Sequence, residues 1–298
     1  MTGTNTPSRS AAPKRPGGVG SLGGRAVARI GYGAMELARL TEDRAQGVAL
    51  VRRAIELGVD HVDTAEFYGG GAVNQILHDA IRPSDGVLIV SKIGADPNPT
   101  GGMVLAQRPD QITASVETQL TTLGVEQIGV MNLRRPGVNP EVPVEQRVDL
   151  DAQLAALRDL RDAGKIGAIG LSNVTFDELQ HALPLGIACV QNSYSLLERS
   201  DEPMLELCRD EGVAWVPFFP LGNRHPGQPR VTDQQVVRAV AEASGWSPAQ
   251  IGLAWLLHHA PNTFVISGTA NPAHLEANLA VSDVVLDRAS MAALDRAY

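Results

Sequence analysis

Short apolar runs alternate with longer amphipathic stretches along the chain from Ala26 onward. An apolar run of about four to eight residues is typical of a buried strand, whereas apolar residues at every third or fourth position are typical of a helix. Strands that alternate with helices predict a parallel sheet with crossover helices. The eight expected strands are Val27–Ile30, His61–Asp63, Val87–Ser91, Ile128–Leu133, Ala168–Leu171, Cys189–Gln191, Ala214–Val216 and Thr263–Ile266.

The stretches between these strands show the helical period. Two of them place an apolar stripe on one helix face that should pack on the core: Ile112, Val116, Leu120 and Leu123 in one, and Leu150, Leu154 and Leu157 in the other. Ser247 followed by Pro248 predicts a helix start, because serine caps free amides and proline suits the first helical position. Segments 233–244 and 287–298 are expected as extra helices.

Polar side chains stand at or just after the carboxyl end of most of the expected strands. They are Asp63, Lys92, Arg134, Ser172 with Asn173, Gln191 with Asn192, and Ser267 with Thr269. An open doubly wound sheet would also alternate strands and helices. In a barrel, however, the carboxyl ends of all strands converge on one face, where active sites are built. We therefore expect a (β/α)8 TIM barrel over residues 25–298 with a site at that face.

The first 24 residues differ from the rest of the chain in composition. They are rich in proline, glycine, serine and threonine, which predicts a disordered tail. Lys14 and Arg15 are followed by glycines rather than an apolar run, so the tail does not resemble a secretory signal. Residues 18–23 match the dinucleotide fingerprint G-x-G-x-x-G, but no strand precedes them and no helix follows, so we reject this interpretation.

Charge and cysteine content narrow the class of protein further. The net charge is -8 and the basic residues are scattered, which argues against nucleic acid or anionic lipid as a partner. Apolar runs fall short of the roughly 18 residues needed to span a bilayer. Cys189 and Cys208 are the only cysteines, so a disulfide framework is excluded and a cytoplasmic location is favoured. The histidines lack metal-ligand spacing, and we expect no metal.

Five runs of residues occur in an order that is characteristic of one superfamily. The longest is Gly58–Gly69, with the sequence GVDHVDTAEFYG, and it is followed by runs at 90–92, 164–173, 190–197 and 267–278. Together they resemble the aldo-keto reductase superfamily over roughly residues 26–290. The run Val130–Arg135 is similar to a bacterial branch related to pyridoxal reductases. The resemblance implies an NADPH-dependent oxidoreductase that acts on a small-molecule carbonyl substrate as a monomer or small homo-oligomer.

Reduction of a carbonyl by hydride requires a bound nicotinamide and a proton donor that works near neutral pH. A tyrosine can serve if a lysine lowers its pKa and an aspartate holds that lysine charged. The resemblance assigns these roles to Tyr68, Lys92 and Asp63. Each residue also has a structural alternative: Asp63–Glu66 fits a helix capping box, Lys92 a solvated strand end, and Tyr68 an aromatic residue in a turn.

The resemblance also implies a set of cofactor contacts. Hydrogen bonds to the nicotinamide carboxamide are expected from Ser172, Asn173 and Gln191, and the ring should stack on Phe218, which could otherwise be a core residue. Leu221 and Gly222 would pass near the pyrophosphate. The region that binds the adenosine 2'-phosphate corresponds to Gly268, Thr269, His274 and Asn278. Many relatives have Lys and Arg where this chain has Gly268 and His274, so NADH remains an alternative to NADPH, and His274 could be a surface helix residue.

The family's fourth catalytic residue, a histidine, aligns with Arg134. Arginine cannot accept a proton, but it can donate to a carbonyl oxygen. We expect Arg134 to point into the barrel mouth near Tyr68, and Asn132, two residues earlier, to share its face and contact the substrate. The alternative is that Arg134 folds outward to a surface carboxylate while Arg135 or water fills the site.

These residues favour the reduction of an aldehyde or ketone to an alcohol, with Tyr68 as proton donor. Loss of the histidine leaves a second reaction open, the reduction of an activated C=C bond. A cofactor-binding regulatory or redox-sensing subunit is a third alternative. The substrate depends on the loops after the strands, such as 94–107 and 222–231, whose sequences are hard to interpret.

Overall fold

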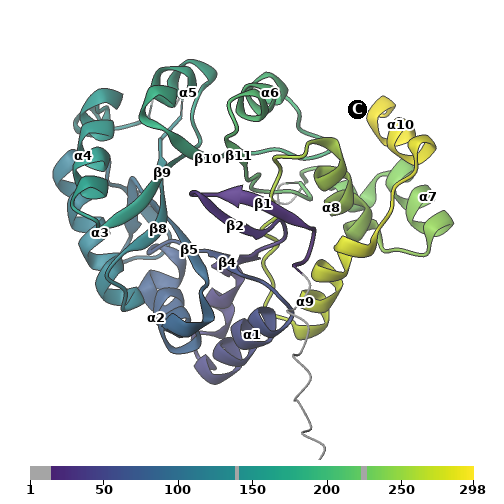
Figure 1. Cartoon of the computed structure of the whole chain (residues 1–298), viewed down its shortest axis with the longest axis horizontal. Coiled ribbons are helices and arrows are strands. Elements are labelled where there is room, and N and C mark those ends of the chain that lie inside the picture. Colours follow the sequence, from purple (N-terminus) through teal and green to yellow (C-terminus); the bar gives the residue numbers. More distant parts are fainter. Residues whose placement is uncertain (1–14, 138–140, 223–226) are drawn as a thin grey trace, which may run out of the picture.

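The computed structural model describes residues 15–137, 141–222 and 227–298. Seven parallel strands form the central sheet in the order β11-β10-β9-β8-β5-β4-β3 (Figure 1). Parallel bridges join Thr263 to Trp215 and Val265 to Ile30, so the segment at 263–265 closes the sheet as an eighth strand. The predicted (β/α)8 barrel is confirmed. The strand bounds are β3 Tyr32–Gly33, β4 His61–Asp63, β5 Leu88–Ile93, β8 Ile128–Arg134, β9 Ile166–Ser172, β10 Ile187–Gln191 and β11 Ala214–Trp215.

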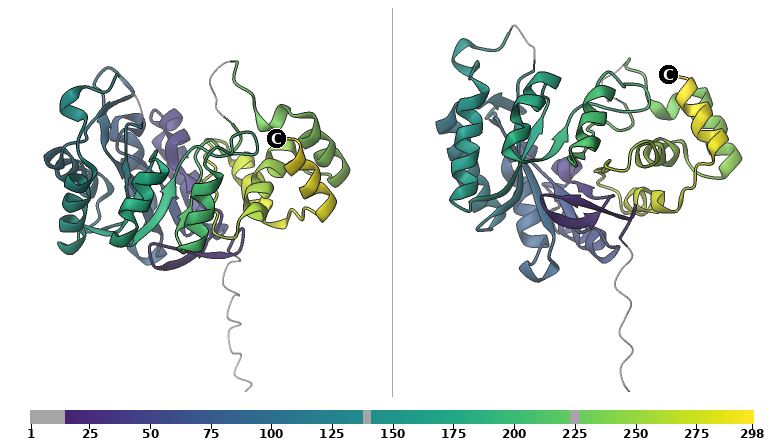
Figure 2. Two further views of the ribbon diagram at one scale, coloured as in Figure 1. Left: turned by 90° about the horizontal axis from the view of Figure 1, so that it is seen from above. Right: turned by 45° about the horizontal axis from the view of Figure 1, so that its top comes forward.

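Helices surround the sheet, and the predicted apolar stripes of α3 and α4 are buried against it. Ser247 caps α8 by accepting a hydrogen bond from the amide of Gln250, as predicted. Figure 2 shows α7 and α10, the two extra helices, at the side of the barrel near the C-terminus. The bounds are α1 Arg44–Glu56, α2 Ala72–Ala80, α3 Pro109–Leu123, α4 Leu150–Asp162, α5 Phe176–Ala182, α6 Glu202–Asp210, α7 Gln235–Ser244, α8 Pro248–His259, α9 Pro272–Leu279 and α10 Arg288–Arg296. No helix in the described ranges is long and apolar enough to cross a membrane.

The structure of the amino-terminal segment differs from two predictions. β1 (Val19–Leu22) and β2 (Arg25–Ala28) form an antiparallel hairpin, so the predicted tail is wrong for residues 19–24, while residues 1–14 lie outside the described residues. The first barrel strand is β3 rather than Val27–Ile30. The hairpin is ordered because Leu22 and Val27 are each only 1% exposed and pack with apolar residues inside the barrel. Gly18, Gly20, Gly23 and Gly24 interrupt the apolar pattern of this segment, so its composition favoured a tail.

The glycines of the rejected dinucleotide fingerprint have a packing role in this hairpin. A Cβ atom on Gly20 would lie 2.4 Å from Cζ of Phe264, so only glycine fits there. Gly23 takes a φ of 58° in the turn between the two strands. The motif therefore closes the amino-terminal end of the barrel, and its spacing reflects close packing instead of phosphate binding.

His61 is buried in the barrel at the start of β4. It is 0% exposed, and neither ring nitrogen has a hydrogen-bond partner among the described residues. Its ring packs edge-on against Phe264, with the centroids 5.9 Å apart. Burial lowers the pKa of His61 to about 4, although Asp60 and Asp63 oppose the shift. The folded protein therefore holds this imidazole neutral.

This burial predicts acid sensitivity of the fold. The unfolded chain protonates His61 near pH 6.5 and the folded chain only near pH 4, so the unfolded state binds more protons in this interval and stability falls as the pH falls. The loss from this group should be about 2 kcal/mol between pH 7 and pH 5. Urea unfolding at both pH values should show a smaller fall for His61→Gln than for the wild type. An equal fall in the two proteins would contradict the prediction.

Candidate active site

A cavity of about 1230 Å³ opens at the carboxyl ends of the barrel strands. This volume exceeds what a single drug-sized ligand needs and suits a dinucleotide together with a small substrate. Its walls come from strand ends and from the loops that follow them. Most of the predicted site residues line it: Asp63, Tyr68, Lys92, Arg134, Ser172, Gln191, Phe218, Leu221, Gly222, Gly268, Thr269, His274 and Asn278.

Asp63 and Lys92 form a buried ion pair at the base of this cavity. They meet because β4 and β5 are neighbouring parallel strands that both end here. Lys92 also donates to the carbonyl of Thr64 at 3.0 Å, and Gln191 Nε2 donates to the second carboxylate oxygen of Asp63 at 2.7 Å. Burial alone would lower the pKa of Lys92, but Asp63 and Tyr68 raise it above its ordinary value. The ammonium is therefore charged and held in place.

Tyr68 follows β4 at the start of a short turn and lines the cavity. Nζ of Lys92 lies 5.2 Å from the centroid of its ring. Burial raises the pKa of Tyr68 above its ordinary value, and Lys92 and Arg134 lower it only in part because Asp63 offsets them. Lys92 lowers the pKa of Tyr68, as predicted, but the larger effect of burial leaves that pKa raised. The phenol is consequently protonated at neutral pH and ready to donate.

The turn after Tyr68 requires glycine. Gly69, Gly70 and Gly71 have φ angles of 57°, 63° and 90°, which other residues rarely adopt. A Cβ atom on Gly71 would also lie 2.6 Å from a carboxylate oxygen of Glu66. The turn thus lets the chain reverse tightly over this buried carboxylate, which fixes the position of Tyr68.

A hydrogen-bond network behind the turn replaces the capping box that Asp63–Glu66 could have formed. The hydroxyl of Thr64 donates to Oδ1 of Asn74 at 2.7 Å. Glu66 accepts from Asn74 at 2.6 Å and from the hydroxyl of Thr122 at 2.8 Å. Thr64 and Glu66 therefore tie the loop between Asp63 and Tyr68 to α2 and α3, which makes the loop rigid.

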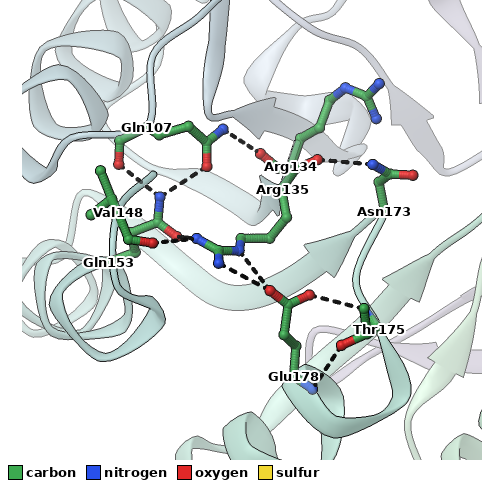
Figure 3. Close-up of polar contacts among 8 residues, drawn as sticks. All are labelled: Gln107, Arg134, Arg135, Val148, Gln153, Asn173, Thr175 and Glu178. Atoms are coloured by element: carbon green, nitrogen blue, oxygen red, sulfur yellow. Dashed lines mark hydrogen bonds and ion pairs between the residues drawn. The ribbon is translucent and has the colours of Figure 1, made fainter. Parts of the chain in front are cut away.

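Arg134 and Arg135, at the end of β8, point in opposite directions (Figure 3). Arg134 lines the cavity, whereas Arg135 binds Glu178 at 3.0 Å and the carbonyl of Val148 at 2.9 Å on the outer side. This is the predicted orientation of Arg134. Burial lowers the pKa of Arg134 and Tyr68 partly opposes the shift, but a guanidinium remains charged in proteins.

Two predicted contacts are not supported by the geometry. Asn132 is 0% exposed and accepts a hydrogen bond from Sγ of Cys189 at 3.1 Å in the barrel interior. It shares the face of Arg134, but two residues of strand place it about 7 Å deeper, below the cavity. Asn132 is not among the residues that line the cavity, and its expected substrate contact stays a prediction. Asn173 lies outside the lining residues and its Nδ2 donates to the carbonyl of Arg135 at 3.0 Å, so this amide group already has a partner and its expected contact with the carboxamide stays a prediction.

The remaining residues fit a nicotinamide dinucleotide. Oε1 of Gln191 is buried and has no hydrogen-bond partner among the described residues, so it can accept from the carboxamide amide beside Ser172. Phe218 presents a ring to the same cavity. Gly268 packs so tightly that a Cβ atom would lie 2.4 Å from the carbonyl oxygen of Gly33, which explains why no lysine stands here.

Several cavity residues were missed by sequence reasoning. They come from the connections that follow strands β3, β4, β5 and β11, which include a 3-10 helix at Ala34–Leu40 and the short strand β7 at Met103–Leu105. They are Met35, Glu36, Arg39, Phe67, Met103 and Arg230. Met103 and Arg230 fall in the segments 94–107 and 222–231, on which the substrate was expected to depend, but neither residue could be singled out there. Within residues 15–137, 141–222 and 227–298, no group of three His, Cys, Asp or Glu side chains could hold a metal ion.

A barrel with this cavity and this Asp–Lys–Tyr arrangement defines a class of nicotinamide-dependent oxidoreductases, and comparison with known proteins agrees. The model of the aldo/keto reductase family matches residues 29–298, so the chain belongs to this family. Its members are NAD(P)H-dependent oxidoreductases. The resemblance seen in the sequence is therefore confirmed.

Individual relatives cover nearly the whole chain. Pyridoxine 4-dehydrogenase of Escherichia coli is 37% identical over 282 residues, which are 92% of this chain and 96% of that protein. An aldo-keto reductase of Klebsiella pneumoniae, solved in complex with NADPH, is 27% identical with a TM-score of 0.79 and covers 94% of this chain and 95% of its own. A second K. pneumoniae structure, with NADP and acetate, has 26% identity, a TM-score of 0.78 and 96% coverage of both chains.

Proposed function

We propose that this protein uses NADPH to reduce an aldehyde or ketone to an alcohol, with Tyr68 as the proton donor. The observation that carries the proposal is the meeting of Tyr68, Lys92 and Asp63 at the base of one cavity whose other residues fit the cofactor. The E. coli relative is named for the oxidation of pyridoxine. An aromatic aldehyde of the pyridoxal type is therefore the first substrate to test.

Each of these side chains has a separate role in the reduction. When bound, the reduced nicotinamide supplies the hydride. Tyr68 donates its proton to the oxygen that becomes the alcohol, and Lys92 stabilises the phenolate that remains. Asp63 keeps Lys92 charged and oriented. Arg134 donates to the same oxygen as negative charge develops on it, which a preorganised cation does at low cost.

A screen of NADPH oxidation distinguishes this proposal from its alternatives. The substrates should include pyridoxal, simple aldehydes, quinones and enones, followed by absorbance of the reduced cofactor. Turnover of aldehydes with formation of the alcohol supports the proposal. Turnover confined to enones would instead indicate reduction of an activated C=C bond, and turnover of none, despite cofactor binding, would indicate a regulatory subunit.

We expect NADPH to bind at least several-fold more tightly than NADH. His274 and Arg230 line the cavity and can face the additional phosphate, although Gly268 contributes no charge. One charge-assisted hydrogen bond contributes about 1.5 to 3 kcal/mol. Quenching of tryptophan fluorescence on titration with each cofactor measures the two dissociation constants. Equal constants would show that 2'-phosphate recognition has been lost.

A further inference from the structure

Arg134 carries a charge that nothing nearby balances. Among the residues that the structure describes, its guanidinium makes no hydrogen bond and no ion pair, and the nearby phenol of Tyr68 is protonated and therefore uncharged. The neighbouring Lys92 is neutralised by Asp63. A partly buried cation without a partner is costly, and a ligand that brings an anion into the cavity removes that cost.

The backbone that carries this guanidinium is held from behind. Gln107 donates to the carbonyl oxygen of Arg134 at 2.8 Å and to that of Gly94 at 2.6 Å, while Gln153 holds Gln107 at 2.9 Å (Figure 3). A Cβ atom on Gly94 would lie 2.2 Å from the carbonyl oxygen of Arg134, so the two strand ends are in close contact. The backbone at Arg134 is thus tightly held, and its side chain extends from it into the cavity.

The cavity that Arg134 enters also has large apolar side chains in its walls. Phe67, Met35 and Met103 line the same cavity, and the two methionines are 42% and 43% exposed. Methionine and aromatic side chains pack well on flat rings. A guanidinium is planar and presents paired donors that bind two oxygens side by side. The site therefore combines an apolar surface on which a ring can pack with a guanidinium that can bind two adjacent oxygens.

We propose that Arg134 selects substrates in which an ionised oxygen stands next to the reacting carbonyl, as in an aromatic aldehyde with an ortho phenolate. One arm of the guanidinium binds the ionised oxygen and the other lies toward the carbonyl oxygen that Tyr68 protonates. This inference rests on the proposed reductase function and specifies its substrate class.

Three nitrobenzaldehydes test the inference, because the nitro group keeps a phenol ionised at neutral pH. One carries a hydroxyl ortho to the aldehyde, one carries it para, and one carries an ortho methoxy group of similar size but no charge. The wild type should show a KM for the ortho phenolate about ten- to a hundredfold lower than for the other two. Arg134→Met should abolish this preference, and Arg134→Lys should retain part of it.

Binding gives a second readout that does not depend on turnover. The absorption of the nitrophenolate should shift when it binds to protein loaded with NADP+, and Arg134→Met should weaken binding of the ortho compound alone by about tenfold or more. Arg209→Met, which removes an exposed arginine on α6, is the matched control and should change nothing. Reduction of all three aldehydes without preference, or a preference that survives in Arg134→Met, would overturn the inference. Reduction of none of them would overturn the proposed function on which it rests.

Discussion

Replacing Tyr68 with phenylalanine should lower kcat for carbonyl reduction by about a hundredfold or more, the usual scale for a lost acid. The fold and cofactor binding should survive, because the ring keeps its edge-on contact with Phe67 at 5.1 Å and only the hydroxyl is lost. Steady-state kinetics and a fluorescence titration with NADPH measure the two effects separately. Retained turnover would show that another group donates the proton.

The dependence of the rate on pH identifies the hydroxyl more directly. Burial raises the pKa of Tyr68 above its ordinary value of about 10, so the phenol stays protonated throughout the neutral range. Reduction by the wild type should therefore decline only at strongly alkaline pH, and the residual activity of Tyr68→Phe should lack that decline. Tyr298→Phe, at an exposed tyrosine bound to Gln234, is the control and should behave like the wild type.

Much of this site could be predicted because its residues stand at strand ends. Asp63, Lys92 and Arg134 are polar residues that terminate apolar runs, and a barrel brings such ends together. The face of the strand from which each side chain projects was also predictable, since alternate residues of a strand share a face. The depth of a residue inside the barrel was not predictable. Asn132 shares the face of Arg134, yet it is fully buried and does not line the cavity.

Other features depend on contacts between distant segments and leave no local pattern. The hairpin formed by β1 and β2 is ordered by the barrel interior that receives Leu22. The pKa of Tyr68 depends on how completely the loop behind it is buried, so the residue types alone suggested the wrong net direction. Met35, in a 3-10 helix, and Met103, in a short strand, reach the cavity from segments whose sequences contain no motif.

The buried ion pair should make Lys92 important for both stability and catalysis. Lys92→Met leaves the carboxylate of Asp63 buried with only Gln191 as a described side-chain partner. Breaking a buried pair in this way costs about 3 to 5 kcal/mol, and urea unfolding at pH 8 should show that loss. Turnover should also fall by about a hundredfold or more, because the phenolate of Tyr68 loses its stabilising cation.

A double variant separates these two consequences. In Lys92→Met combined with Asp63→Asn, no charge is left unpaired, and the asparagine can still bond to Gln191, so most of the lost free energy of unfolding should return. Turnover should remain low, since no ammonium stands beside Tyr68. Recovery of turnover together with stability would show that Lys92 acts only through folding. A single variant as stable as the wild type would show that Asp63 is not held as an anion by Lys92.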